Sequence, residues 1–423
     1  MMRDLLTAAF ATLLLAAGAA SAQQDLRDMV VRTNGTGVRG RVATPFATDE
    51  VVVVQGTRRV RVPAAEVASM DLVNDRLREL LRRRLALRAN ASAQWQLVEW
   101  AGAIGLPAMA RLQAMVLALG PDGGDARAHA WLGNRNERGT WLWRHDDRWL
   151  SFDALVEAAA RAPLELRSEH FVLRLDAGIR EGALALFDLE TLYLWWFDRY
   201  GRQLGLQEAL EPVVVRTHAK ASSFPRWGAT PRAYYVPFPH GDEARVFHAD
   251  GTGRPEDLFA VATEALLHRT LAGTPRMATD RDRPCAWLEV GLGGWASFHL
   301  RGMNGWAVAG DPVGLDIDAL QALSGGFTLT NLVHTPVYEG FHLQDDAATN
   351  VRWSASRMLV AWLLDPTATP RRDESLLRYC REALALGKGD SSSALDECLG
   401  APIESLDEPW RQWLLERARG ANR

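Results

Sequence analysis

The stretch FAVATEALLHRT, residues 259–270, predicts a largely apolar helix that carries one glutamate and one histidine. Glu264 and His268 stand four positions apart, so on a helix both side chains project from the same face. Two polar groups on one stripe of an apolar helix need hydrogen-bond partners, a bound ion or contact with water. The stretch therefore predicts a buried hydrogen-bonded pair, a weak metal site or a solvent-exposed face, and we favour the buried pair.

The residues before this helix predict an α+β domain, because strand-like and helix-like segments follow one another. LELRSEHFVLRLD (164–176) and EPVVVRTH (211–218) are typical of strands. The segment between them, residues 180–201, has the apolar spacing of an amphipathic helix and is expected to end at Gly201.

Two further short strands and two helices are expected downstream. RAYYVPFP (232–239) is expected to be a third strand, and EARVFHA (243–249) an edge strand. The helix at 255–271 comes next, another helix begins near Trp287, and helices dominate the remaining sequence.

The N-terminal part of the chain predicts two different architectures in succession. Residues 26–72 alternate in the manner of strands, as in EVVVVQGTRRVRV (50–62), and Asn34-Gly35 signals a tight turn. We expect a small β-barrel or β-roll of four to five strands. Residues 73–133 change to helical spacing and resemble tetratricopeptide-type packing, which indicates a helical spacer.

Three tryptophans lie close together in RGTWLWRHDDRWL, residues 138–150. Trp141, Trp143 and Trp149 could form an aromatic platform for a sugar. A β-hairpin packed on its neighbour explains them at least as well, and we favour that interpretation.

The order of motifs from Leu164 to about Trp413 resembles the gluzincin, or peptidase-MA-like, superfamily of zinc metallopeptidases. SEHFVLRLD precedes a long helix and a VVV strand, and TEALLH is followed by CAWLEVGLGGWASFHL (285–300). NVRWSASRMLVAWLLD (350–365) resembles the later Y-A-x-S helix of that family. The resemblance implies a thermolysin-like domain, in which a mixed sheet of four to five strands is followed by a helical lobe, with the zinc site between them.

The residues at the metal positions of that family differ in this chain. If Glu264 takes the place of the catalytic base in H-E-x-x-H, then Thr263 and Leu267 take the places of the two histidines. Val290 takes the place of the third ligand, and Trp353 replaces a tyrosine that steadies the oxyanion in relatives. Leucine and valine cannot ligate a metal, and a lone threonine hydroxyl is a poor zinc ligand. We therefore expect no zinc in this register.

A second register leaves a weaker metal site open. Glu264, His268 and Glu289 could supply three ligands, but Ala265 would then stand where the base belongs. Glu289 would also be one residue from the expected position, which is a rotation of about 100° on a helix. The alternative to this metal site is a structural hydrogen bond between Glu264 and His268, joined by Glu289.

The three cysteines indicate one disulfide at most. Cys380 and Cys398 flank the polar turn GKGDSSS, which could bring two helices together, so we expect a bridge between them. Cys285 would remain a buried thiol.

The N-terminus suggests an exported protein, and the charge balance gives no sign of nucleic-acid binding. MMRDLLTAAFATLLLAAGAASAQQ has the apolar run and the A-x-A site of a secretory signal peptide cut after about Ala22, which predicts a periplasmic or extracellular protein. No later segment is long and apolar enough to span a membrane, so we do not expect a membrane-spanning mature protein. A formal net charge of −4 does not suggest nucleic-acid binding.

These observations predict four segments: a signal peptide (1–22), a small β-domain (23–72), a helical spacer with the Trp-rich hairpin (73–160) and a peptidase-MA-like domain (161–423). We expect an inactive metallopeptidase-like protein, without a cofactor, that binds a peptide or protein or acts as a cell-envelope scaffold. The alternatives are an active zinc metallopeptidase with relocated ligands and a cell-wall or polysaccharide binding protein.

Overall fold

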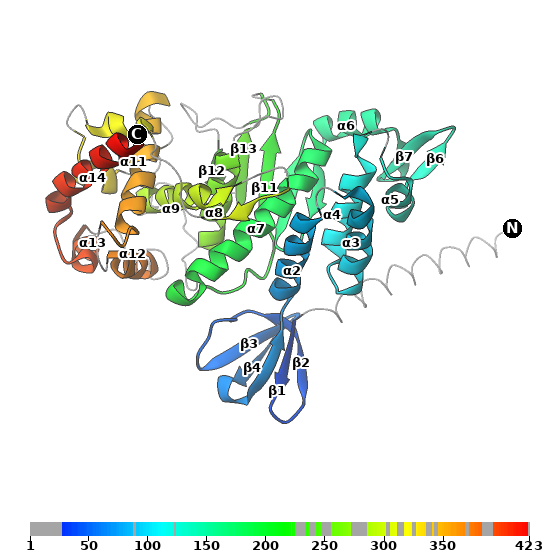
Figure 1. The fold of residues 1–423 in the computed structure, drawn as a ribbon, viewed down its shortest axis with the longest axis horizontal. Coiled ribbons are helices and arrows are strands. Elements are labelled where there is room, and N and C mark those ends of the chain that lie inside the picture. Colours follow the sequence, from blue (N-terminus) through cyan, green and yellow to red (C-terminus); the bar gives the residue numbers. More distant parts are fainter. Residues whose placement is uncertain are drawn as a thin grey trace. The chain divides into compact units, whose positions relative to one another are not determined.

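The structure is a computed structural model, and the chain in it divides into two compact units, Met1–Gly133 and Asn134–Arg423. It describes residues 28–87, 90–121, 124–220, 222–224, 233–236, 242–247, 255–271, 286–301, 305–310, 317–323, 327–335, 341, 346–368, 372–382 and 392–421. The expected signal peptide and Cys285 lie outside the described residues. The fold is mixed α+β, as expected (Figure 1).

Five strands of the first unit form one antiparallel sheet in the order β4-β3-β2-β1-β5. The strands are β1 (Asp28–Arg32), β2 (Gly37–Val42), β3 (Glu50–Gln55), β4 (Arg58–Pro63) and β5 (Val67–Asp71), and the 3-10 turn η1 (Ala64–Glu66) precedes β5. Within residues 28–71 the terminal strands β4 and β5 do not pair with each other, so the sheet does not close. The expected barrel is therefore wrong, because pairing stops at two edges.

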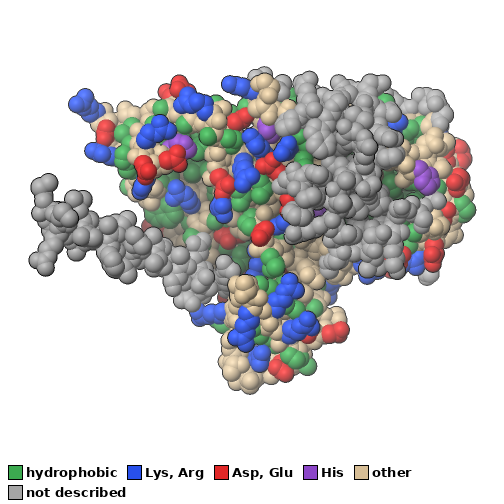
Figure 2. Space-filling model, turned by 180° about the vertical axis from the view of Figure 1, so that it is seen from behind, with side chains coloured by type: hydrophobic (Ala, Val, Ile, Leu, Met, Phe, Trp, Pro, Cys, Tyr) green, Lys and Arg blue, Asp and Glu red, His purple; other side chains and the backbone are tan. Residues whose placement is uncertain are grey.

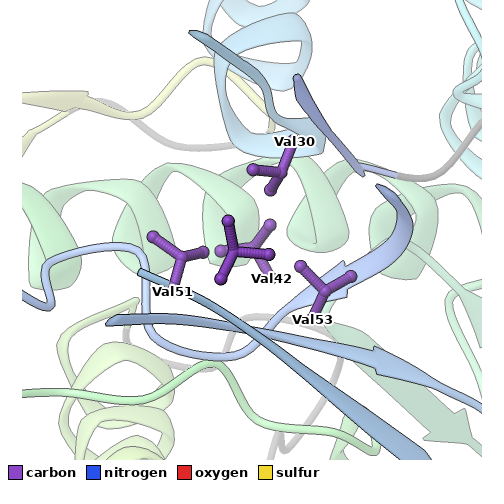
Figure 3. Close-up of a cluster of buried hydrophobic side chains, with 5 residues drawn as sticks. Val30, Val42, Val51 and Val53 are labelled. Atoms are coloured by element: carbon purple, nitrogen blue, oxygen red, sulfur yellow. The ribbon is translucent and has the colours of Figure 1, made fainter. Parts of the chain in front are cut away.

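Valines form the core of this sheet. The register places Val42 opposite Val53, and Val53 opposite Val60, so these side chains point to one face. Val42 and Val53 form a buried cluster with Val30 and Val51 (Figure 3). Val62 also belongs to this cluster, and the partly buried Val60 packs against it. Burial of each valine contributes about 1.5 kcal/mol or more, which is what fixes the register of the strands.

The opposite face of the same sheet is basic. Arg41 lies opposite Val54, and Val54 lies opposite Arg59, so both arginines occupy one row across three strands. Arg61 lies opposite Val52 on the same face and pairs with Glu50 at 2.8 Å. Figure 2 shows Lys and Arg side chains gathered on this sheet, at the bottom of the view.

A buried aspartate joins the sheet to the helices that follow it. Asp28 accepts hydrogen bonds from the backbone N–H groups of Val42 and Val73, at 2.7 Å each. The helices are α2 (Val73–Ala86), α3 (Ala91–Ala103), α4 (Pro107–Ala118) and α5 (Ala126–Trp131), and each packs on the next along the chain. Asn90 caps α3 by accepting the N–H of Ala93, and Pro107 starts α4 where no backbone donor is needed.

The second unit begins with a small antiparallel sheet. It consists of β6 (Arg135–Glu137), β7 (Thr140–His145) and β8 (Arg148–Leu150), followed by α6 (Phe152–Arg161). The Trp-rich hairpin therefore lies in the compact unit that also contains the large mixed sheet, whereas we had expected it in the helical spacer.

A five-stranded mixed sheet forms the centre of the second unit, in the order β12-β13-β11-β10-β9. The three interior strands run parallel to one another: β10 (Phe171–Leu175), β11 (Val213–His218) and β13 (Glu243–Phe247). The outer strands β9 (Leu164–Arg167) and β12 (Ala233–Val236) are antiparallel.

Three expectations about this region need correction. The segment 164–176 is a hairpin of two strands rather than one strand. The strand that begins at Glu243 is interior, and the strand at 233–236 is the edge, which reverses the expected order. The long helix α7 (Ile179–Leu204) continues past Gly201. The residue that follows it, Gly205, adopts the left-handed conformation with φ of 63° and so ends the helix.

One face of the mixed sheet is covered by helices. Leu173, Val215 and Ala244 lie in one row across β10, β11 and β13 and are fully buried. The helix α7 packs on β10, and α8 (Pro255–Thr270) packs on β11, β12 and β13 (Figure 1). The alternating residues point to the opposite, polar face.

A group of helices follows the sheet, and α9 (Ala286–His299) lies between α8 and α11 (Asp346–Leu363). Its glycines permit this close packing. A Cβ atom on Gly293 would lie 2.5 Å from the carbonyl oxygen of Ala260 in α8, and one on Gly291 would lie 2.7 Å from that of Ser356 in α11. Glycine at both positions therefore lets the backbones of three helices approach.

The remaining elements complete the helical part of the second unit. They are β14 (Leu300–Arg301), β15 (Val308–Ala309), η5 (Ile317–Leu323), α10 (Leu329–Val333), α12 (Arg372–Cys380), α13 (Ser392–Leu399), η8 (Ile403–Leu406) and α14 (Asp407–Ala421). Among the described helices, none has the length and apolar character needed to cross a membrane.

Candidate functional site

The helix α8 carries the candidate site, and its position follows from packing on two sides. It lies against the mixed sheet on one side and against α9 on the other. Glu264 and Glu289 are buried in this layer, and His268 is nearly so. The Cγ atom of Glu264 lies beside Gly293, 3.3 Å from where a Cβ atom would stand, so this glutamate packs directly on α9.

The histidine of the site pairs with the glutamate of the neighbouring helix. His268 Nε2 lies 3.3 Å from Glu289 Oε1, and both side chains are more than nine-tenths buried. Glu289 is the residue that the sequence suggested as a third member of the Glu264–His268 pair, and here it contacts His268. Tyr235 of β12 stacks at an angle on the His268 ring, with the ring centroids 5.2 Å apart.

A polar chain continues from Tyr235 to the protein surface. The Tyr235 hydroxyl donates to Asp242 Oδ1 at 2.6 Å, and Asp242 also forms an ion pair with Arg269 of α8. Arg269 donates in turn to the carbonyl oxygen of Glu211 at 3.2 Å. These contacts fix the end of α8 against β12 and the residue before β13, and so they hold His268 in place.

The three residues at the ligand positions of the zinc-peptidase pattern are engaged in other contacts. Leu267 and Val290 are buried apolar side chains. Thr263 is fully buried, and its hydroxyl donates to the carbonyl oxygen of Phe259 at 2.8 Å. A hydroxyl that already bonds its own helix backbone, beside two aliphatic side chains, does not fit a zinc ion.

The relocated ligand set of Glu264, His268 and Glu289 does not form a metal site in the described part of the chain. Among the residues that the structure describes, no group of three His, Cys, Asp or Glu side chains could hold a metal ion, and this includes Glu264, His268 and Glu289.

Trp353, which the sequence resemblance would align with a tyrosine of the zinc peptidases, lies on α11. Its indole nitrogen is buried and has no hydrogen-bond partner within the described part of the chain. It offers an N–H donor where a tyrosine would offer a hydroxyl.

The tryptophan platform is wrong, because the register separates the three indoles. Trp149 lies opposite Arg144, which places it on the face opposite to Trp141 and Trp143. Trp143 is 7% exposed and contacts Phe152 of α6, with ring centroids 6.1 Å apart. Trp149 is 41% exposed. The packed hairpin that we favoured is confirmed.

The expected disulfide is also wrong. Cys380 and Cys398 lie on the neighbouring helices α12 and α13, but both are thiols outside any disulfide. The Cys398 thiol instead lies 3.7 Å from Glu382 Oε2. Burial raises the pKa of this thiol.

A buried polar cluster between β10 and α7 was not predicted. His170 donates its backbone N–H to Glu190 Oε1 at 2.8 Å, and its Nδ1 lies 2.7 Å from Glu190 Oε2. The His170 ring stacks on Tyr193 at 3.6 Å, and the Tyr193 hydroxyl bonds Glu208. Burial alone would raise the pKa of Glu190, but the contact with His170 outweighs burial and lowers it. The sequence signal for this cluster was an acidic residue, Glu190, inside the apolar run of α7.

No model of a known protein family matches this chain, and no curated protein matches it.

Proposed function

We propose that this protein is a metallopeptidase-like protein without peptidase activity, and that it binds a peptide or protein segment in an extended conformation. The observation that carries the proposal is the set of contacts made at the family's metal positions. Thr263 bonds its own helix, Leu267 and Val290 are buried aliphatic side chains, and Glu289 pairs with His268. Glu264 remains at the position of the water-activating base, but the three ligand positions offer no ordinary zinc ligand, so a bound water would have no metal to polarise it.

The position of the edge strand supports peptide binding. Within the described residues, β12 is the last strand of the mixed sheet and pairs only with β13. An extended segment that adds to its outer edge would form main-chain hydrogen bonds, as in other cases of strand addition. That segment would run beside Tyr235 and His268, where a peptidase of this architecture would hold its substrate.

Binding is tested with an unfolded probe and a folded control. Reduced, carboxymethylated α-lactalbumin presents extended segments, and native α-lactalbumin is the matched folded form. We expect saturable binding of the unfolded form only, measured by fluorescence anisotropy, with no cleavage products detected by mass spectrometry.

Hydrogen–deuterium exchange then locates the contact. The amides of β12 (233–236) should gain protection on binding, and those of β9 (164–167), the opposite edge of the same sheet, should not. Binding that leaves β12 unprotected would contradict strand addition at this edge. Stoichiometric zinc together with peptide cleavage that is lost in Glu264→Gln would contradict the whole proposal.

A further inference from the structure

Three arginines lie side by side on the polar face of the mixed sheet. The register places Arg174 of β10 opposite Arg216 of β11, and Arg216 opposite Arg245 of β13. Neighbouring strands are about 4.8 Å apart, so the three arginines start from adjacent points of one row. This face is opposite to the one on which α7 and α8 pack, so the row is separate from His268 and Glu289.

The two outer arginines are neutralised by glutamates. Arg245 Nε lies 2.9 Å from Glu243 Oε2, and Arg174 reaches Glu243 Oε1 at 3.4 Å. Arg174 also pairs with Glu165 at 3.4 Å. Glu243 is therefore shared by the two arginines that flank Arg216.

The central arginine has no such partner. Among the described residues, Arg216 forms no ion pair, and its buried Nε atom has no hydrogen-bond acceptor. A half-buried guanidinium between two other cations is unfavourable unless an anion compensates its charge. Among the described residues, Arg216 is therefore the arginine of this row that no carboxylate contacts.

A buried histidine near Arg216 also lacks a hydrogen-bond partner among the described residues. His218 follows two positions later on β11, so its side chain points to the same face. The His218 side chain is 1% exposed, and its ring centroid lies 5.3 Å from that of Phe224. Within the described part of the chain, neither nitrogen of the His218 ring has a hydrogen-bond partner. A buried imidazole without a partner is unfavourable, so a bound group that accepts its N–H would stabilise the fold.

We propose that Arg216 and His218 together bind the oxyanion of a small ligand, a carboxylate or a phosphate group. The guanidinium offers paired N–H donors that match the oxygens of such a group, and the imidazole offers one more. One oxyanion would thus satisfy the Arg216 charge, its Nε–H and a ring nitrogen of His218. The site lies at the end of β11, among parallel strands whose carboxyl ends commonly form ligand sites.

The charges around His218 couple this binding to protons. Burial, with the nearby Arg216 and Arg245, lowers the pKa of His218 to about 4, and Asp176 and Glu243 oppose that shift. An oxyanion adds negative charge beside the ring, so it favours the imidazolium and raises the pKa. Binding takes up a proton, and the affinity for the anion should rise as the pH falls from about 7.5 to about 5.5.

The test uses the purified full chain and two probes, inorganic phosphate and acetate, at constant ionic strength in chloride. The chain has 10 histidines, and ¹³Cε1 labelling of histidine resolves them in NMR spectra, with His218 assigned from a His218→Asn variant. We expect at least one probe to move the His218 resonance saturably and to raise its pKa. The probe that binds more tightly identifies the oxyanion.

Substitutions separate this site from a general attraction of anions. Arg216→Gln should weaken binding about tenfold or more, whereas Arg216→Lys should retain part of it. Arg167→Gln removes a positive charge from the same sheet face, at its edge, and should change the affinity less than about twofold. Circular dichroism and Tm verify folding, and Arg216→Lys serves as the test if Arg216→Gln does not fold.

Two results would overturn the proposal. One is a His218 resonance that neither probe displaces at millimolar concentration. The other is equal binding by the Arg216 and Arg167 variants, which would indicate nonspecific attraction of anions to the basic face.

Discussion

His268 Nε2 on α8 lies 3.3 Å from Glu289 Oε1 on α9, and this contact joins the two helices of the candidate site. The same two residues would be ligands in the relocated zinc site, but here they bond each other. Because both side chains are buried, their contact contributes to stability in a way that substitution can measure.

Glu289→Ala should destabilise the protein by about 2 kcal/mol or more, since it leaves a buried imidazole without its carboxylate. Glu165→Ala, at the edge of the mixed sheet, removes a partly exposed carboxylate and should cost less than about 1 kcal/mol. Urea unfolding followed by circular dichroism measures both values. Equal losses would mean that the His268–Glu289 contact is not a stabilising pair.

Gly293→Ala should destabilise the protein by about 2 kcal/mol or more, because its Cβ atom would stand 2.5 Å from the backbone oxygen of Ala260. Gly182→Ala in α7 meets first a flexible side-chain end, Leu175 Cδ2 at 2.7 Å. The gain in helix propensity should offset that contact and keep the change within about 1 kcal/mol. The urea midpoints of the two variants measure both effects. If Gly293→Ala were as stable as the unsubstituted protein, α8 and α9 would be able to move apart.

Glu190→Gln should cost about 2–4 kcal/mol, because it removes the charge that faces His170 inside the cluster of α7 and β10. The control is Glu181→Gln, an exposed residue in the first turn of the same helix, which should cost less than about 1 kcal/mol. Thermal unfolding compares the two variants. If Glu190→Gln were neutral, the cluster would be dispensable for the fold.

Asp365 should make the protein sensitive to acid. Burial raises its pKa, but hydrogen bonds from Thr367, Arg417 and Trp413 outweigh burial and lower the pKa from 3.8 to about 2. The stabilisation is therefore fully present above about pH 4 and is lost as the pH falls toward 2, by roughly 1–2 kcal/mol. Asp365→Asn should flatten the dependence of unfolding free energy on pH in that window. An unchanged slope in the variant would assign the acid sensitivity to other groups.

The thiols of Cys380 and Cys398 should each be modified separately when the protein is unfolded without a reductant. Peptide mass spectrometry after alkylation should find one adduct on each residue, and dithiothreitol should not change Tm. The raised pKa of Cys398 should also make its alkylation slow in the folded protein at neutral pH. A disulfide-linked pair of peptides that contains Cys380 and Cys398 would contradict this prediction.

Part of the candidate site could be predicted from sequence, because it depends on local spacing. A spacing of four positions places Glu264 and His268 on one helix face whatever surrounds them. The identities of Thr263, Leu267 and Val290 exclude ordinary zinc ligands without any coordinates. The partner of His268 was harder to predict, since Glu289 reaches it from another helix.

The sequence by itself determined the elements with a strong local period: the valine strands of the first sheet and the helices α8 and α9. Only the tertiary structure decided which strand forms the edge, which face Trp149 occupies, and that Arg174, Arg216 and Arg245 form one row. The edge strand and the arginine row depend on pairing between strands that are distant in the chain, and the face of Trp149 depends on the register of its hairpin. Because a shift of one residue in register moves every side chain to the other face, local spacing could not determine them.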